Sequence, residues 1–234
     1  MARLPRIDVP GVPQHLIIRG NNRSTLFRDD ADRCIFLQLV EKALRVCACD
    51  LHAYVLMTNH VHLLATGHLV GELSEMMQRI ERKFARLVNI RWDRTGTLFE
   101  GRFRSSLVQS EAYLFTCMQY IELNPVRAGI VRHPKEFAWS SYRKNASGEP
   151  DELLTPHELY RQLGPTPSDR GASYRGLVAA GISDDDLARI RVCLAKCRAL
   201  GSEGFCREMA QRLDRPVAPQ PQGRPKRGQV EKLT

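Results

Sequence analysis

Residues 51–66, LHAYVLMTNHVHLLAT, contain two strand-like runs that are separated only by Thr58-Asn59. Two such runs joined by a two-residue connection predict a β-hairpin. His60 and His62 open the second run, and side chains at i and i+2 on a strand lie on the same face of the sheet. Both imidazoles are therefore expected to project together, with Val61 and Leu63 on the opposite face.

Elements of regular period flank this hairpin on both sides. The expected elements are a strand over 13–20, a helix over about 30–48 capped by Asp29 or Asp30, the hairpin, a helix over 71–90, a strand within 97–109, and a helix capped by Ser110. The order β-α-β-β-α-β-α is typical of an α+β, ferredoxin-like (RRM-like) fold. Such a fold has four antiparallel strands with two helices on one face, to which this chain adds one further helix.

The chain divides into three predicted regions. Residues 1–148 form the domain that contains the sheet, 149–216 a helical extension, and 217–234 a basic tail. In the extension, Thr155-Pro156-His157-Glu158 predicts a capping box, and Ser183 begins a helix to about Leu200, followed by another over 203–213. The last two helices are equally compatible with a DNA-binding helix-turn-helix and with a plain helical hairpin.

Composition indicates a globular chain with an anionic partner. The 234 residues are 43% hydrophobic and carry a formal net charge of +9, so nucleic acid is the first partner to consider. No stretch approaches the ~18 consecutive apolar residues of a membrane span, and no apolar segment follows the N-terminal charges. Seven scattered cysteines without a CxxC pair indicate reduced thiols. A cytoplasmic protein without membrane contact is expected.

Basic residues concentrate on the second predicted helix and the segment that follows it. Arg79, Lys83 and Arg86 are spaced at i, i+4 and i+7, and Arg102 and Arg104 continue the run. A solvated helix face is the competing interpretation, at about even odds. We treat these five as candidate DNA-binding residues.

The tail is rich in proline, glycine and cations, a composition typical of disorder in the free chain. It contains Gly223-Arg224-Pro225-Lys226-Arg227, a pattern that can enter a narrow A·T minor groove, so Arg224 is a further DNA-binding candidate. A generic basic tail is the favoured interpretation of this short segment.

Tyr120 and Asn124 are four residues apart on the last helix of the predicted sheet domain and therefore share a face. Asn124 precedes Pro125, which places it at the end of that helix, where its amide oxygen is available to a cation. Taken alone, the histidine pair is compatible with two hydrogen-bonded histidines, and Tyr120 with a packing role.

Three motifs in order nevertheless resemble one family. The motifs are Asn59-His60-Val61-His62-Leu63-Leu64, Phe99-Glu100-Gly101-Arg102-Phe103, and Tyr120-Ile121-Glu122-Leu123-Asn124-Pro125-Val126-Arg127-Ala128-Gly129. Residues of about 10–145 are similar to the IS200-type single-tyrosine transposases of the HUH class, and most similar to the REP-associated tyrosine transposases.

The resemblance implies a function and a set of site residues. His60, His62 and Asn124 would hold Mg²⁺ or Mn²⁺, although many members have glutamine at the position of Asn124. Tyr120 would attack single-stranded or hairpin DNA and form a 5′-phosphotyrosine, with no need of ATP. The family implies a DNA-nicking and strand-transferring enzyme, active as a monomer or a homodimer, that acts on hairpin-forming repeat DNA.

Two alternatives from other classes remain open at this point. One is a regulator with the same fold that grips hairpin DNA without cleaving it. The other is a metal-dependent nuclease in which water, and not Tyr120, attacks the phosphate. Substitution of Tyr120 separates the alternatives, because only the transposase needs the phenol.

Overall fold

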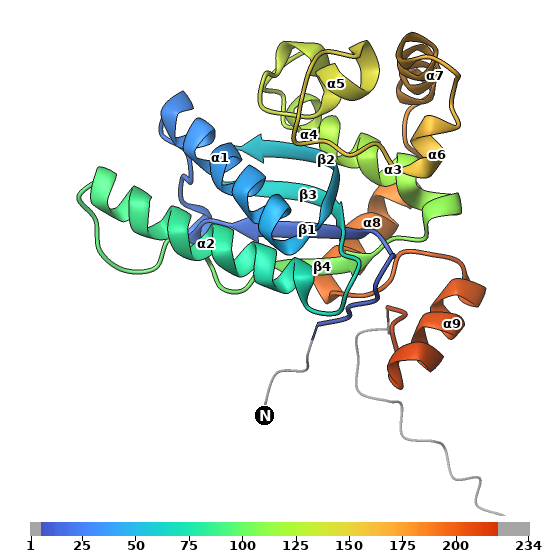
Figure 1. Cartoon of the computed structure of the whole chain (residues 1–234), viewed down its shortest axis with the longest axis horizontal. Coiled ribbons are helices and arrows are strands. Elements are labelled where there is room, and N and C mark those ends of the chain that lie inside the picture. Colours follow the sequence, from blue (N-terminus) through green and yellow to red (C-terminus); the bar gives the residue numbers. More distant parts are fainter. Residues whose placement is uncertain (1–5, 220–234) are drawn as a thin grey trace, which may run out of the picture.

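The computed structural model describes residues 6–219 and contains the predicted antiparallel sheet, with strand order β2-β3-β1-β4 (Figure 1). The strands are β1 (Gln14–Arg19), β2 (Asp50–Met57), β3 (His60–Thr66) and β4 (Arg104–Leu107). Adjacent strands are antiparallel in every pair, and β1 and β3 are the two central strands. The ferredoxin-like fold class is thus confirmed.

Helices α1 (Asp30–Cys47) and α2 (Glu72–Arg91) cover one face of the sheet (Figure 1). Alternate residues along the strands point to this face, among them Val61 and Leu63 on β3, which form one buried cluster with the apolar sides of the two helices. Phe36 and Phe84, one from each helix, pack edge to face with ring centroids 5.1 Å apart. Burying this apolar surface is the main force that holds the two helices on the sheet.

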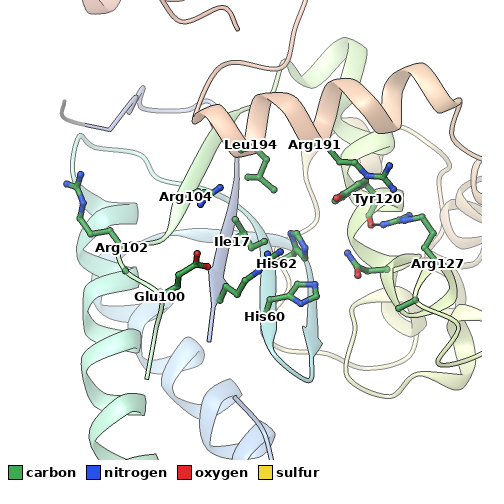
Figure 2. Close-up of a pocket in the computed structure, with 15 residues that line it drawn as sticks. Ile17, His60, His62, Glu100, Arg102, Arg104, Tyr120, Arg127, Arg191 and Leu194 are labelled. Atoms are coloured by element: carbon green, nitrogen blue, oxygen red, sulfur yellow. Dashed lines mark hydrogen bonds between the residues drawn. The ribbon is translucent and has the colours of Figure 1, made fainter. Parts of the chain in front are cut away.

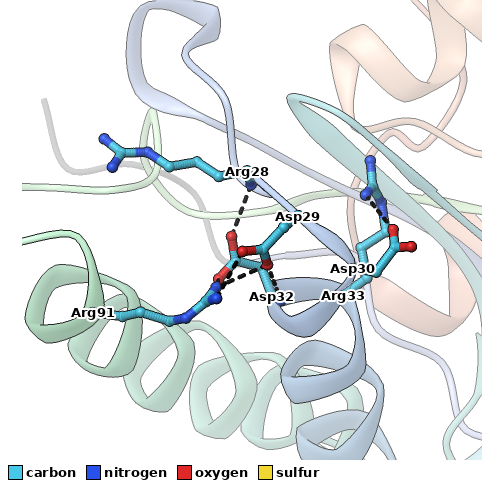
Figure 3. Close-up of polar contacts among 6 residues, drawn as sticks. All are labelled: Arg28, Asp29, Asp30, Asp32, Arg33 and Arg91. Atoms are coloured by element: carbon cyan, nitrogen blue, oxygen red, sulfur yellow. Dashed lines mark hydrogen bonds and ion pairs between the residues drawn. The ribbon is translucent and has the colours of Figure 1, made fainter.

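An ion network fixes the start of α1 against the end of α2 (Figure 3). Arg91 donates to both Asp29 and Asp32, and Asp32 is fully buried. The backbone N–H of Arg28 also donates to Asp32, at 2.8 Å. Asp29 accepts a hydrogen bond from the Asp32 N–H and is the N-cap that the sequence predicts. The buried carboxylate therefore has the partners it needs.

The opposite face of the sheet is covered by α3 (Ser110–Glu122) and α8 (Asp184–Lys196), with shorter elements around them (Figure 1). The remaining elements are η1 (Asn21–Arg23), α4 (Asn124–Arg127), η2 (Pro134–Glu136), α5 (Tyr142–Ser147), α6 (Glu158–Arg161), α7 (Pro167–Ala180) and α9 (Glu203–Leu213). One buried cluster combines sheet residues such as Val55 and Leu64 with Tyr174 of α7 and Ile190 of α8.

Two predicted caps are wrong. Ser110 is the first residue of α3 and does not cap it, because Gln109 occupies the cap position. Thr155 forms no capping box, since its backbone N–H donates to Leu51 on the sheet edge. His157 caps the short helix α6 instead.

A capping box does form further along the chain. It joins Thr166 and Asp169 at the start of α7, a helix that the sequence analysis does not anticipate. The predicted helix from Ser183 is confirmed with Ser183 as its cap, but it ends at Lys196 and not near 200, because Cys197 adopts a left-handed backbone conformation.

The described part of the basic tail is residues 217–219; residues 220–234, including Arg224, lie outside the described range. Val217 is buried, and its carbonyl accepts a hydrogen bond from the Ala199 N–H. Across residues 6–219, no helix is long and apolar enough to cross a membrane.

Candidate functional site

The face of the sheet opposite α1 and α2 presents the two histidines of the HxH pair. On β3, His60 and His62 alternate with Val61 and Leu63, which are buried under α1 and α2. The register pairs His62 with Ile17 and His60 with Arg19 on the neighbouring strand. The predicted projection of both imidazoles to one face is therefore present, and side chains from β1 flank them.

His60 is held by its neighbour in the hairpin turn. Its Nδ1 lies 2.7 Å from Oδ1 of Asn59, and since this oxygen can only accept, Nδ1 carries the proton. Burial lowers the pKa of His60 to about 4, the charge of Arg19 acts in the same direction, and a hydrogen bond with the Asn124 side chain opposes both. His60 is thus a neutral imidazole with Nε2 as its basic nitrogen.

His62 is supported from behind by His15, a residue of β1 that the sequence analysis missed. Nε2 of His15 lies 2.8 Å from Nδ1 of His62, and both side chains are buried. Burial lowers the pKa of His15 to about 3, and burial also lowers that of His62 well below its usual value. The pair is therefore neutral. The strand register that brings His15 beside His62 gives no signal in the sequence itself.

Tyr120 on α3 lies against this histidine group. Its ring centroid is 5.8 Å from that of His62 and 5.6 Å from that of His15, in both cases edge to face. The guanidinium of Arg127 lies over the other side of the phenol, 4.5 Å from the ring centroid, and donates to the Tyr120 carbonyl oxygen. The tyrosine is thus fixed between the histidines and a cation.

Asn124 joins the same group at the junction between α3 and α4. α3 ends at Glu122 and Asn124 is the first residue of α4. The predicted place of Asn124 in the last turn of the tyrosine helix is therefore wrong, because Asn124 lies two residues beyond its end. Its side chain hydrogen-bonds His60. The structure therefore brings together the four residues that the sequence analysis selected for chemistry: His60, His62, Tyr120 and Asn124.

These groups line one cavity of about 500 Å³ (Figure 2). Its lining residues are Ile17, Arg19, His60, His62, Glu100, Gly101, Arg102, Arg104, Tyr120, Asn124, Arg127, Ala128, Arg191, Leu194 and Ala195. Five of them are arginines and one is a carboxylate, and the two histidines are neutral. The net positive charge suits an anionic ligand.

The predicted DNA-binding residues separate into three groups. Arg102 and Arg104 line the cavity. Arg79, Lys83 and Arg86 belong to α2, which covers the other face of the sheet, and Arg79 is engaged by Glu75 at 2.5 Å. Arg224 lies outside the described residues. Sequence reasoning assigned no role to Arg127 or Arg191, which the fold places beside Tyr120 (Figure 2).

A buried carboxylate anchors the tyrosine helix. Glu122, the last residue of α3, is fully buried and accepts hydrogen bonds from Ser141 Oγ at 2.5 Å, Asn145 Nδ2 at 2.8 Å and the Tyr174 hydroxyl at 2.7 Å. Burial nevertheless raises the pKa of Glu122 to about 7, with the three donors acting in the opposite direction. The network ties the end of α3 to α5 and α7, two residues from Tyr120.

The donor set fits a divalent cation bound through two imidazoles and one amide. Metal-bound histidines as a rule donate their second ring N–H to a neighbouring acceptor, which fixes the tautomer. Asn59 accepts from His60 in this way, and His15 Nε2 is in place to accept from His62 Nδ1. Within residues 6–219 no set of three or more His, Cys, Asp or Glu side chains is grouped to hold a metal ion, and the donors present here are two imidazoles and one amide.

Comparison with known proteins agrees with this fold. Residues 8–124 match the family model described as IS200-like transposases. The match spans half of the chain, and the protein belongs to the IS200-like transposase family. No curated protein matches the chain.

Two solved structures are similar to it. One is a REP-associated tyrosine transposase bound to a REP hairpin, at 18% identity over 67% of this chain and 93% of that chain, with a TM-score of 0.55. The other is a protein from Deinococcus radiodurans R1 described as a transposase, at 19% identity over 52% of this chain and 96% of that chain, with a TM-score of 0.35. The first similarity supports the fold.

The buried Glu122 predicts a pH-dependent contribution to stability. Its folded pKa of about 7 exceeds the ordinary 4.5, so the stability it contributes is fully present below pH 4.5 and is lost as the pH rises through 7. Relative to Glu122→Gln, the wild type should therefore lose about 3 kcal/mol of its free energy of unfolding between pH 4 and pH 8.

Urea denaturation at both pH values measures this shift. Glu152→Gln, a change at an exposed glutamate, is the matched control and should show no such shift. A pH-independent difference for Glu122→Gln would contradict the prediction.

Proposed function

We propose that this protein is a metal-dependent single-stranded DNA endonuclease and strand transferase that acts through a 5′-phosphotyrosine on Tyr120. One observation carries the proposal: a phenol and two neutral imidazoles lie together at the wall of a cation-lined cavity, with the Tyr120 and His62 ring centroids 5.8 Å apart. Membership of the IS200-like transposase family supports it.

In the proposed reaction, Tyr120 loses its phenolic proton and its oxygen attacks the phosphorus of the scissile phosphodiester. A phosphorus–oxygen bond to tyrosine forms, the bond to O3′ breaks, and O3′ takes up a proton as the free 3′-hydroxyl. The new ester keeps the bond energy, so a second 3′-hydroxyl can reverse the step and join strands without a nucleotide cofactor. Arg127 lies over the phenol ring, so its positive charge is next to the attacking group.

His60, His62 and Asn124 would hold the divalent cation, Mg²⁺ or Mn²⁺. When bound, the ion neutralises charge on the phosphate and orients it for in-line attack. The contribution of the protein is to keep both imidazoles neutral by burial and to fix their tautomers through Asn59 and His15.

The proposed substrate is single-stranded DNA beside a hairpin. The solved relative of the same fold is bound to a REP hairpin, and the arginines of the cavity suit a phosphate backbone. Both histidines, the amide and the tyrosine come from one chain, so the proposed reaction needs no exchange of helices between two subunits.

Covalent capture tests the nucleophile. We expect the full-length protein with Mn²⁺ to form a covalent adduct with a single-stranded hairpin oligonucleotide, detected as a shifted band on a denaturing gel. Tyr120→Phe should abolish the adduct, because the phenol oxygen that forms the ester is then missing, and Tyr113→Phe should leave it intact, because Tyr113 lies outside the cavity under Arg189.

Other outcomes identify other functions. Adduct formation by Tyr120→Phe would rule out this nucleophile. Strand scission that survives Tyr120→Phe but is lost in His62→Ala would indicate a nuclease in which water attacks. Hairpin binding by the wild type without any scission would indicate a non-cleaving regulator.

The hydrogen bond between His15 and His62 is expected to strengthen the binding of the metal ion. Replacing His15 with Phe removes the acceptor for His62 Nδ1–H, and such supporting contacts affect metal affinity by about 10- to 100-fold. Titration of the DNA-free protein with Mn²⁺ by calorimetry should therefore show a weaker Kd for His15→Phe. His15→Gln, which retains an acceptor, should lose less of the Mn²⁺ affinity. Equal Mn²⁺ affinities for the wild type and His15→Phe would contradict the role of His15 in supporting His62.

A further inference from the structure

Helix α8 closes one side of the cavity at the tyrosine (Figure 2). Arg191, Leu194 and Ala195 of this helix are among the lining residues. The helix lies in the extension, beyond the segment 8–124 that matches the family model. Part of the cavity wall is therefore supplied by a region that the family match does not include.

The position of α8 is fixed by the sheet. Three residues on the inner side of α8, Ile190, Cys193 and Leu194, are buried. The chain that follows the helix pairs with the end of β4 and the residues just after it. Leu200 N–H donates to the Leu107 carbonyl at 2.7 Å, and Gln109 N–H donates to the Leu200 carbonyl at 2.9 Å. These contacts hold α8 against the sheet, beside the site that contains Tyr120.

Arg191 extends from α8 toward Tyr120, and Arg127 extends toward the same ring from α4 (Figure 2). Partial burial lowers the pKa of Arg127, the phenol of Tyr120 opposes this change, and the charge of the neighbouring Arg191 adds to it. Arg191 is exposed and, among residues 6–219, makes no ion pair with a carboxylate.

Two neighbouring guanidinium groups without a carboxylate repel each other unless an anion lies between them. Guanidinium groups bind phosphate oxygens through paired, charge-assisted hydrogen bonds. Since Arg127 and Arg191 line the same cavity and both extend toward Tyr120, a phosphate positioned for attack by its phenol would meet both of them.

We infer that Arg191 is a phosphate-binding residue of the active site, which together with Arg127 binds the non-bridging oxygens of the phosphodiester that Tyr120 attacks. The inference rests on the proposed function and extends it by making the helical extension part of the catalytic centre. The negative charge on these oxygens is redistributed as the bond to tyrosine forms, so a donor fixed in advance by α8 stabilises the transition state.

The experiment compares charge-matched variants of the full-length protein. Arg191→Gln removes the proposed contact, Arg191→Lys keeps the charge without the paired donors, and Arg207→Gln removes one charge from an exposed position on α9 away from the cavity. The rate constant for adduct formation with a single-stranded hairpin oligonucleotide and Mn²⁺ is measured at saturating DNA.

Arg191→Gln should lower this rate constant by about 100-fold, as loss of one oxyanion donor does in other enzymes. The rate constant of Arg191→Lys should lie between those of Arg191→Gln and the wild type, and that of Arg207→Gln should equal that of the wild type. Unchanged thermal unfolding of Arg191→Gln would show that the loss is not one of folding. Equal rate constants for Arg191→Gln and Arg207→Gln would overturn the inference.

A binding measurement keeps the inference separate from the proposed function. In the Tyr120→Phe background, where no adduct forms, the slope of log affinity for the oligonucleotide against log salt should fall by about 0.7 for Arg191→Gln, the value for one phosphate contact on a single strand. Arg207→Gln should leave it unchanged. If the wild type forms no adduct, the proposed function fails, and this slope alone decides whether Arg191 binds phosphate.

Discussion

The antiparallel pairing of β1 with β3 is the constraint on which the rest of the site depends. Its register sets Ile17 opposite His62, so residues of one parity on both strands are buried under α1 and α2. The other parity lies on the opposite face, where Ile17, Arg19, His60 and His62 line the cavity. A slip by one residue would move every one of these side chains to the other face. The apolar core beneath α1 and α2 therefore selects the register that brings His15 behind His62.

The second requirement is a fixed position for the tyrosine helix. α3 lies on the histidine face, and Glu122 at its end is held by hydroxyl and amide donors from α5 and α7. A buried carboxylate without these partners would cost several kcal/mol, so the network specifies one arrangement of α3. Helices that follow the family-matched segment thereby hold the nucleophile, and α8 encloses it.

The sequence was informative where local period and spacing decide the outcome. Alternation on β3 was enough to place both histidines on one face, and the period of 71–90 was enough for α2. The capping box at Thr166 is a local feature, since Thr166 and Asp169 are three residues apart in Thr-Pro-Ser-Asp, and the sequence analysis overlooked it. The packing of α8 depends instead on contacts between residues far apart in the chain, and no local pattern predicts it. His15 and Arg191 were missed for the same reason: each reaches the site through tertiary packing, as the pairing of β1 with β3 and the backbone bonds between Leu200 and Leu107 show.

The most direct test is to locate the covalent bond on the chain. The wild type is incubated with a single-stranded hairpin oligonucleotide and Mn²⁺, digested with nuclease and trypsin, and analysed by tandem mass spectrometry. Cleavage after Arg104 and Arg127 releases one peptide that contains both Tyr113 and Tyr120. The proposed mechanism predicts a nucleotide mass on this peptide with the fragment ions assigning it to Tyr120. Modification of Tyr113, or strand cleavage without any modified tyrosine, would contradict it.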